Sequence, residues 1–132
     1  MTHILNHILL IDDDDITNFI NERVIKRDNY ANNITVMHSS EDALRYLSTI
    51  TSNAKPDLIL LDINMPAMNG WEFIEEYKKI DASITKDIRL VMLTTSINPD
   101  DRMKALENSH IHDFKVKPLS TDILDEIIND LF

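Results

Sequence analysis

The stretch LILLDINMP, residues 58–66, decides the fold of this chain. Its first four residues are all apolar, which is typical of a strand buried on both faces of a sheet. The run ends on one carboxylate, Asp62, and Asn64 follows two residues later. An aspartate after a strand most often only caps a loop, so the meaning of Asp62 depends on what the other strands carry.

The first strand predicted in the chain ends in the same way. Residues 8–11 are apolar and are followed by four consecutive acids, Asp12 to Asp15. Adjacent carboxylates repel one another unless a cation lies among them, so this run favours a divalent ion. On composition alone, a solvated acidic loop is the simpler interpretation.

Strands and helices alternate along the chain. The predicted strands are residues 8–11, 34–37, 58–62, 88–93 and 113–116. A helix follows each of them; the first begins at Ile16, and the others follow the capping residues Ser39-Ser40, Asn69, Asn98 and Ser120. Strict alternation with short connections implies parallel strands in one sheet that is covered on both faces. In such sheets, function gathers at the carboxyl ends of the strands.

The predicted helices differ in their apolar faces. The helix after Asn98 offers chiefly Met103 and Leu106. The final helix has the clearest amphipathic stripe, formed by Ile123, Leu124, Ile127, Ile128 and Leu131. We therefore expect the helix after Asn98 to be the least firmly anchored one.

Composition limits the class of protein. The chain has 132 residues, about one domain with a core of its own, and its lack of cysteine excludes disulfides and thiolate metal sites. A net charge of -10 argues against direct nucleic-acid binding, which depends on clustered Lys and Arg. Since neither a secretory signal nor an apolar stretch of membrane-spanning length is found, we expect a soluble, cytoplasmic protein without membrane contact.

The predicted strand ends together carry a chemically coherent set of side chains. This set is Asp12, Asp13, Asp62, Thr94 and Lys117. Carboxylate and carbonyl oxygens are ligands of Mg²⁺, which often completes its shell with a phosphoryl oxygen. A hydroxyl and an ammonium facing such an ion suit a transferring phosphoryl group, because its catalysis is mostly positioning and charge neutralisation.

Four motifs in the same order give the chain a family resemblance. They are ILLIDDDD at residues 8–15, LILLDINMPAMNG at 58–70, VMLTTS at 91–96 and FKVKPL at 114–119. With them the chain resembles the receiver domains of two-component response regulators, as a single receiver domain over residues 1–132. The resemblance implies an α/β, flavodoxin-like (CheY-like) fold. That fold is a doubly wound, five-stranded parallel sheet of strand order 2-1-3-4-5 with five flanking helices.

The resemblance also implies roles at the site. Asp62 is then the phosphoacceptor, which takes a phosphoryl group from a phosphohistidine and forms an acyl phosphate. Asp13 binds Mg²⁺ directly and Asp12 largely through water, while Asp62 and the backbone carbonyl of Asn64 complete the protein ligands. The donor is a sensor histidine kinase or a histidine phosphotransfer protein.

Three further residues are implied in the response to phosphorylation. Lys117 neutralises phosphoryl oxygens, and Thr94 donates its hydroxyl to the phosphoryl group. Phe114 matches the switch aromatic that moves inward behind Thr94. This movement remodels the surface made by the helix after Asn98, the strand at residues 113–116 and the final helix, and so controls binding of a downstream protein or a phosphorelay.

The chain departs from the family pattern at several positions. Thr95 replaces a smaller residue, which bears on access to the phosphoryl group and on the lifetime of the acyl phosphate. Phe114 replaces a tyrosine and so lacks a hydroxyl, although Phe is a familiar alternative there. Residues 109–112 replace a small Gly-Ala pair, and Asp15 stands where proline is frequent.

Three other interpretations compete with a receiver. A haloacid-dehalogenase-type phosphotransferase also uses an aspartate after a parallel strand, but it needs a second acid where this chain has Asn64. A flavodoxin-like FMN binder needs a glycine-rich loop, and Gly70 is the only glycine here. A receiver fold that docks partners without phosphorylation is disfavoured by the intact acids. The sequence leaves open whether the chain is a stand-alone regulator or an excised domain.

Overall fold

A five-stranded parallel sheet forms the centre of the protein, for which the computed structural model describes residues 4–51 and 53–132. The strand order is β2-β1-β3-β4-β5, as the sequence predicts. The strands are β1 (Leu5–Ile11), β2 (Ala31–Met37), β3 (Leu58–Leu61), β4 (Arg89–Thr94) and β5 (Asp113–Val116). The helices are α1 (Asp15–Arg27), α2 (Ser40–Thr49), α3 (Gly70–Tyr77), α4 (Ala82–Thr85), α5 (Pro99–Leu106) and α6 (Thr121–Leu131).

The helix count corrects one prediction. Six helices are present in the described part of the chain rather than the five expected, because α4 forms a single turn between α3 and β4. Asp81 caps this turn by accepting from the Ser83 N–H at 2.9 Å, and none of its four residues is buried. A short turn without a buried face has no apolar periodicity to reveal it. The helix predicted after Asn98 is therefore α5, and the final one is α6.

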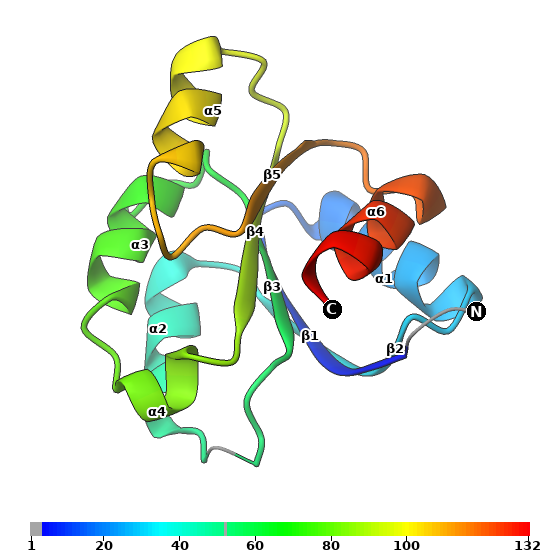
Figure 1. Ribbon diagram of the computed structural model, residues 1–132, viewed down its shortest axis with the longest axis horizontal. Coiled ribbons are helices and arrows are strands. Elements are labelled where there is room, and N and C mark those ends of the chain that lie inside the picture. Colours follow the sequence, from blue (N-terminus) through cyan, green and yellow to red (C-terminus); the bar gives the residue numbers. More distant parts are fainter. Residues whose placement is uncertain (1–3, 52) are drawn as a thin grey trace.

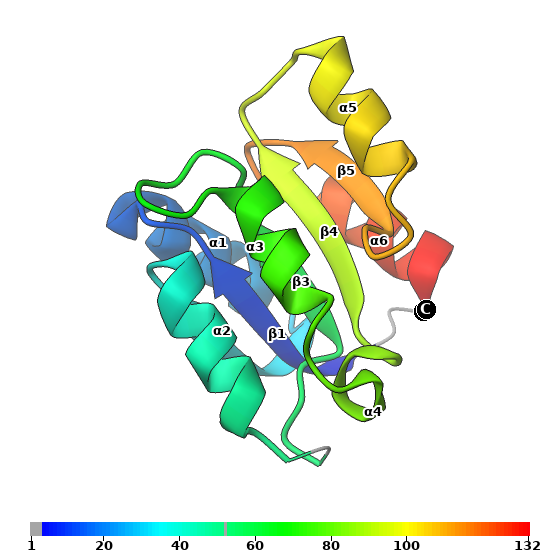
Figure 2. The same cartoon turned by 90° about the vertical axis from the view of Figure 1, so that its left-hand side faces the viewer.

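Helices cover both faces of the sheet. In Figure 1, α1 and α6 lie on one side of the sheet, and α2, α3 and α5 lie on the other. Side chains along each strand alternate between the two faces. One core packs Leu9, Ile11, Ile59, Leu61, Leu90 and Met92 against α2, α3 and α5, and the other packs Ile8, Leu10, Leu58, Leu60, Val91 and Leu93 against α1 and α6. Because the paired strands are all parallel, their carboxyl ends lie at the same edge of the sheet, and the arrowheads of β1 and β4 in Figure 2 point to it.

The predicted helix caps are confirmed. Ser39, Asn98 and Ser120 each accept a backbone N–H from the first turn of the helix that they open. Asn69 and Glu72 form a reciprocal capping box, with hydrogen bonds of 2.9 and 3.1 Å. These caps fix where each helix leaves its loop at the carboxyl edge of the sheet.

The first helix forms as predicted, but it turns its apolar residues outward. Ile16, Phe19 and Ile20 are 70%, 60% and 47% exposed. The buried side chains of α1 are instead Asn18, Asn21 and Ile25. An apolar stripe therefore lies open to solvent on the helix that follows the acidic run.

Candidate functional site

Four strands deliver polar side chains to one edge of the sheet. Asp12 follows β1, Asp62 follows β3, Thr94 ends β4 and Lys117 follows β5. Backbone hydrogen bonds hold these ends in register: the Asp62 N–H donates to the Ile11 carbonyl at 3.0 Å, and the Lys117 N–H donates to the Thr94 carbonyl at 2.7 Å. The peptide bond between Lys117 and Pro118 is cis.

Three carboxylates meet at this edge. Asp12 and Asp62 are only 4% and 7% exposed, whereas Asp13 is open to solvent. One oxygen from each of the three lies within 4.8 Å of the others. Hard oxygen ligands at this spacing, with one face open to water, fit a divalent cation such as Mg²⁺. Asn64 lies exposed in the loop after Asp62.

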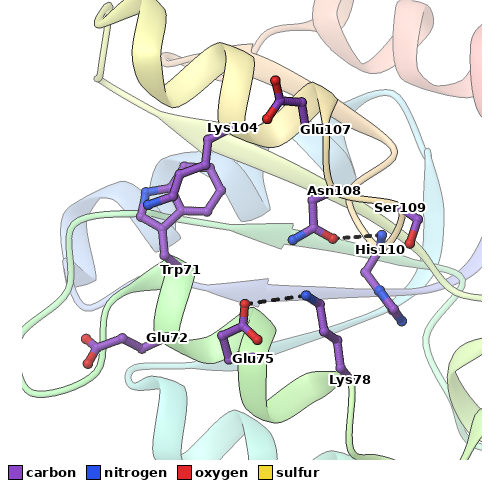
Figure 3. A pocket seen from close by; sticks show the side chains of 9 residues that line it. All are labelled: Trp71, Glu72, Glu75, Lys78, Lys104, Glu107, Asn108, Ser109 and His110. Carbon is purple, nitrogen blue, oxygen red and sulfur yellow. Dashed lines mark hydrogen bonds and ion pairs between the residues drawn. The ribbon is translucent and has the colours of Figure 1, made fainter.

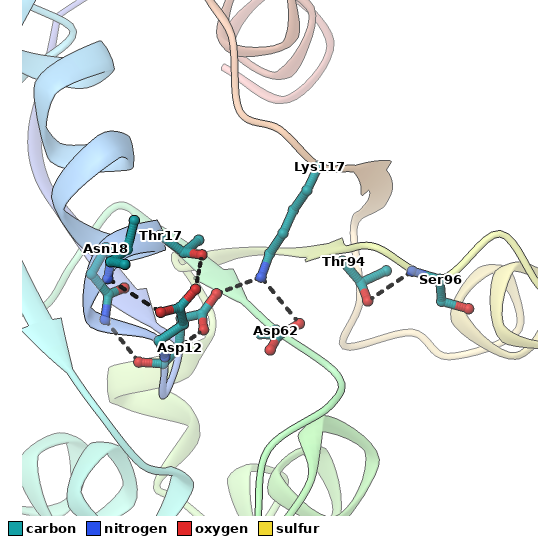
Figure 4. Close-up of polar contacts among 9 residues, drawn as sticks. Asp12, Thr17, Asn18, Asp62, Thr94, Ser96 and Lys117 are labelled. Carbon is teal, nitrogen blue, oxygen red and sulfur yellow. Dashed lines mark hydrogen bonds and ion pairs between the residues drawn. The ribbon is translucent and has the colours of Figure 1, made fainter.

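Lys117 bridges the two buried carboxylates (Figure 4). Its ammonium lies 2.5 Å from Oδ2 of Asp12 and 3.4 Å from Oδ1 of Asp62. Burial and the neighbouring Asp12 raise the pKa of Asp62, and the Lys117 ammonium opposes that rise. The one ammonium does not balance the negative charge of the three carboxylates. The site therefore favours the binding of a metal ion.

The turn after β1 is locked by residues that the sequence analysis did not single out. Nδ2 of Asn18 donates to the Asp12 carbonyl at 2.8 Å, and the Asp14 N–H donates to Oδ1 of Asp12 at 3.0 Å. Asp14 also caps α1 and accepts from the Thr17 hydroxyl at 2.6 Å. Asn18 is buried, and its place in the first turn of the helix after the acidic run is the only feature of the sequence that could have pointed to it.

Gly70 brings α3 close to the residue after β3. Its N–H donates to the Ile63 carbonyl at 2.8 Å. A β-carbon at this position would lie 2.7 Å from the carbonyl oxygen of Asp62 and 2.9 Å from the Cα of Ile63. Any larger residue would therefore push the backbone at Asp62 out of place.

The two predicted switch residues are both buried. Thr94 is fully buried, and its Oγ1 accepts from the Ser96 N–H at 3.2 Å (Figure 4). Phe114 is 4% exposed and packs in the core beneath α3 and α5.

A separate hollow lies between α3 and α5. It has a volume of about 550 Å³, and Trp71, Glu75, Lys104 and Glu107 are among its lining residues (Figure 3). The Lys104 ammonium sits 4.8 Å from the centre of the Trp71 ring, a cation–π contact that joins α5 to α3. Trp71 is the only tryptophan of the chain, so its fluorescence reports on this contact.

Within residues 4–51 and 53–132, Asp12, Asp13 and Asp62 are the only group of three acids, histidines or cysteines with metal-binding spacing. His110 and His112 belong to no such group among these residues. In the same part of the chain, no helix is both long and apolar enough to cross a membrane.

Comparisons with known proteins find response regulators. Residues 8–129 match the response regulator receiver domain family. The chain is 28% identical over 126 residues to the probable methanogenesis regulatory protein FilR2 of Methanothrix harundinacea, with 94% of this chain and 79% of that protein covered. It spans 45% of an uncharacterized response regulatory protein of Staphylococcus epidermidis, to which it is 25% identical.

Solved structures agree with this match. A two-component response regulator from Cytophaga hutchinsonii superposes with a TM-score of 0.91 at 31% identity, and 98% of each chain is covered. A two-component response regulator from Legionella pneumophila gives a TM-score of 0.77 at 33% identity, with 96% and 97% covered. The sequence, the sheet order and the acidic edge agree, and the chain belongs to the family of response regulator receiver domains.

Proposed function

We propose that this chain is a phosphorylation-dependent signalling switch in which Asp62 accepts the phosphoryl group. The observation that carries the proposal is the surroundings of Asp62. It is a nearly buried carboxylate with Lys117 at 3.4 Å and a second buried acid, Asp12, beside it. A carboxylate held among a cation and potential metal ligands is suited to attack phosphorus rather than to stabilise the fold.

The phosphoryl donor is a phosphohistidine on a sensor histidine kinase or on a histidine phosphotransfer protein. An oxygen of Asp62 attacks phosphorus, the P–N bond breaks, and its electron pair leaves with the imidazole nitrogen. The product is an acyl phosphate on Asp62 and a free histidine on the donor. Small phosphodonors transfer a phosphoryl group to Asp62 in the same way. Water slowly hydrolyses the acyl phosphate, which releases inorganic phosphate and regenerates the Asp62 carboxylate without any further catalytic protein.

Asp12, Asp13 and Asp62, with the Asn64 backbone carbonyl, would hold Mg²⁺ at this edge. When bound, the ion supplies positive charge that offsets the charge of the phosphoryl oxygens. The Lys117 ammonium, already between Asp12 and Asp62, would contribute further positive charge. The Thr94 hydroxyl would donate to the phosphoryl group once that group is present.

The output surface consists of α5, β5 and α6. Met103, Leu106 and Val116 expose apolar side chains on these elements, at 58%, 68% and 41%. Reorientation of Thr94 reaches α5 through the loop that follows β4. Phe114, which is buried beneath this surface, would move inward behind Thr94 when that side chain turns to the phosphoryl group.

The outward apolar stripe of α1 offers a docking surface for the phosphodonor. Ile16, Phe19 and Ile20 lie directly after the acidic run that leads from Asp12. An exposed apolar patch beside a reactive group favours a protein partner. The net charge of -10 also favours a protein over a nucleic acid as the downstream target.

Intact-mass measurement after incubation with Mg²⁺ and phosphoramidate tests the proposal. The wild-type chain should gain one phosphoryl group, labile to hydroxylamine, and Asp62→Asn should gain none. Gain of the adduct by Asp62→Asn would contradict the role of Asp62. If the wild-type chain binds Mg²⁺ but gains nothing, it is a docking module that works without phosphorylation.

Lys117→Ala separates charge neutralisation from metal binding. We expect Mg²⁺ to bind still, because the carboxylates remain, while phosphorylation no longer changes the output surface. The measurement is a pair of ¹H–¹⁵N correlation spectra, recorded with Mg²⁺ before and after phosphorylation. Full spectral changes in α5 of the variant would exclude this role for Lys117.

A further inference from the structure

Hydrogen bonds through Ser96 hold the connection between β4 and α5. On one side, the Ser96 N–H donates to Oγ1 of Thr94 at 3.2 Å. On the other, the Ser96 hydroxyl donates to Oδ2 of Asp101 at 2.5 Å and accepts from the Asn98 N–H at 3.3 Å. Ser96 thus links two parts of the protein. Its main-chain N–H contacts the buried Thr94, and its side chain contacts the first turn of α5.

The contact between Ser96 and Asp101 is the strongest of these links. A hydrogen bond to a carboxylate is shorter and stronger than one between neutral groups. Both residues are partly buried, which limits competition from water. Asp100, in the same turn, is exposed and makes no side-chain hydrogen bond or ion pair with any described residue, so it provides a matched control.

The links constrain any movement of Thr94. Turning this side chain towards a phosphoryl group on Asp62 draws its Oγ1 away from the Ser96 amide. To keep its hydrogen bond to Thr94, Ser96 must move with it. That movement either breaks the hydrogen bond between Ser96 and Asp101 or displaces α5. Because Ala105 is the only buried residue of α5, little apolar packing resists such a displacement.

We infer that Ser96 and Asp101 form a latch that holds Thr94 and α5 in the resting arrangement, meaning the one in this structure. The inference rests on the proposed function and adds two positioning residues to it. A group that binds only the released arrangement has to overcome the latch, so its apparent affinity is its intrinsic affinity multiplied by the fraction of molecules that are released. Removal of the latch should therefore tighten binding at Asp62.

Beryllofluoride, a phosphoryl analogue, tests this by calorimetric titration of the full chain in Mg²⁺. Asp101→Ala and Ser96→Ala should each bind it about tenfold more tightly than wild type, the change expected for loss of one charged hydrogen bond. Asp100→Ala should bind as wild type does. The double variant Ser96→Ala/Asp101→Ala should bind no more tightly than either single variant, because both remove the same contact.

A second measurement reads the latch without any phosphoryl analogue. Hydrogen exchange at the Ser96 and Asn98 amides should accelerate in Asp101→Ala and stay unchanged in Asp100→Ala. Unchanged exchange and unchanged beryllofluoride affinity in Asp101→Ala would overturn the latch while leaving the proposed function intact. Lower thermal stability with no gain in affinity would also overturn it, since that is a structural role alone.

Failure of the proposed function gives a different result. In that case wild type and all variants bind no beryllofluoride, whatever their exchange rates. That result would contradict both the proposed function and the latch, because the latch is defined by its effect on binding at Asp62.

Discussion

The helices α5 and α6 flank the edge strand β5 from opposite faces of the sheet, and they are held in different ways (Figure 1). The α6 helix buries Leu124, Ile127 and Ile128. The α5 helix buries only Ala105 and exposes Met103 and Leu106. Burial of a Leu or Ile side chain stabilises a fold by about 1.5–3 kcal/mol, whereas a hydrogen bond contributes about 1 kcal/mol.

The polar contacts sharpen this difference. In α6 they add to apolar packing, as when the Tyr30 hydroxyl donates to Asp125 at 2.6 Å. In α5 they replace it, through Ser96 with Asp101 and through Lys104 with Trp71. Displacing a helix that is held by apolar burial exposes that surface to water, which costs free energy. A helix that is held by polar contacts can move if new polar contacts replace the old ones. The difference therefore makes α5 the element that a phosphoryl group can displace.

The largest effect is expected when one leucine from each helix is replaced by alanine. Leu124→Ala in α6 should lower the free energy of unfolding by about 3 kcal/mol, because it removes fully buried methyl groups and leaves a cavity. Leu106→Ala in α5 should change it by less than about 0.5 kcal/mol, since the side chain is 68% exposed. Urea denaturation measures both. Equal losses would show that α5 is anchored as firmly as α6.

A smaller effect comes from the tether between Tyr30, the residue before β2, and Asp125 of α6. Tyr30→Phe should cost about 1 kcal/mol, because the Asp125 carboxylate loses the hydroxyl that donates to it. Urea denaturation at pH 7 measures this cost. No loss of stability would show that packing alone holds α6.

The same tether predicts a dependence on pH. Burial and the Asp125 carboxylate raise the pKa of Tyr30 from 10.0 to about 12. A group whose pKa is raised by folding stabilises the fold below its unfolded pKa and loses that contribution as the pH rises through the folded value. Wild type should thus lose more stability between about pH 10 and 12 than Tyr30→Phe does. Identical pH profiles of unfolding would contradict this.

The smallest effect is expected for the contact between α5 and α3. Lys104→Ala should cost about 0.5 kcal/mol, the usual value of an exposed cation–π pair, and should shift the fluorescence of Trp71. Arg102→Ala is the control, because its side chain makes no contact of this kind within the described residues. A Trp71 spectrum that responds equally to both variants would show that Lys104 does not rest on the ring.

Much of the fold follows from local sequence. Runs such as residues 58–61 reveal buried strands, and Asn69 and Ser120 mark helix starts, because these signals depend on near neighbours alone. The thin apolar face of α5 is confirmed by its exposure. The acids at the ends of β1 and β3 meet because parallel neighbours place their carboxyl ends side by side.

The rest depends on tertiary context. Helical spacing identifies α1 but not its inner face, and the helix buries Asn18 instead of Phe19 because Asn18 binds the Asp12 carbonyl. The position of the Phe114 ring depends on the packing of α3 and α5. The contact of Ser96 with Asp101 depends on the path of a loop, which no periodicity encodes.

Hydrogen exchange with and without beryllofluoride, in Mg²⁺, tests most directly the claim that α5 moves while α6 stays. We predict altered exchange in residues 95–107 and unchanged exchange in residues 121–131. Altered exchange in α6 with none in α5 would contradict the account, because it would place the switch in the helix that apolar burial holds.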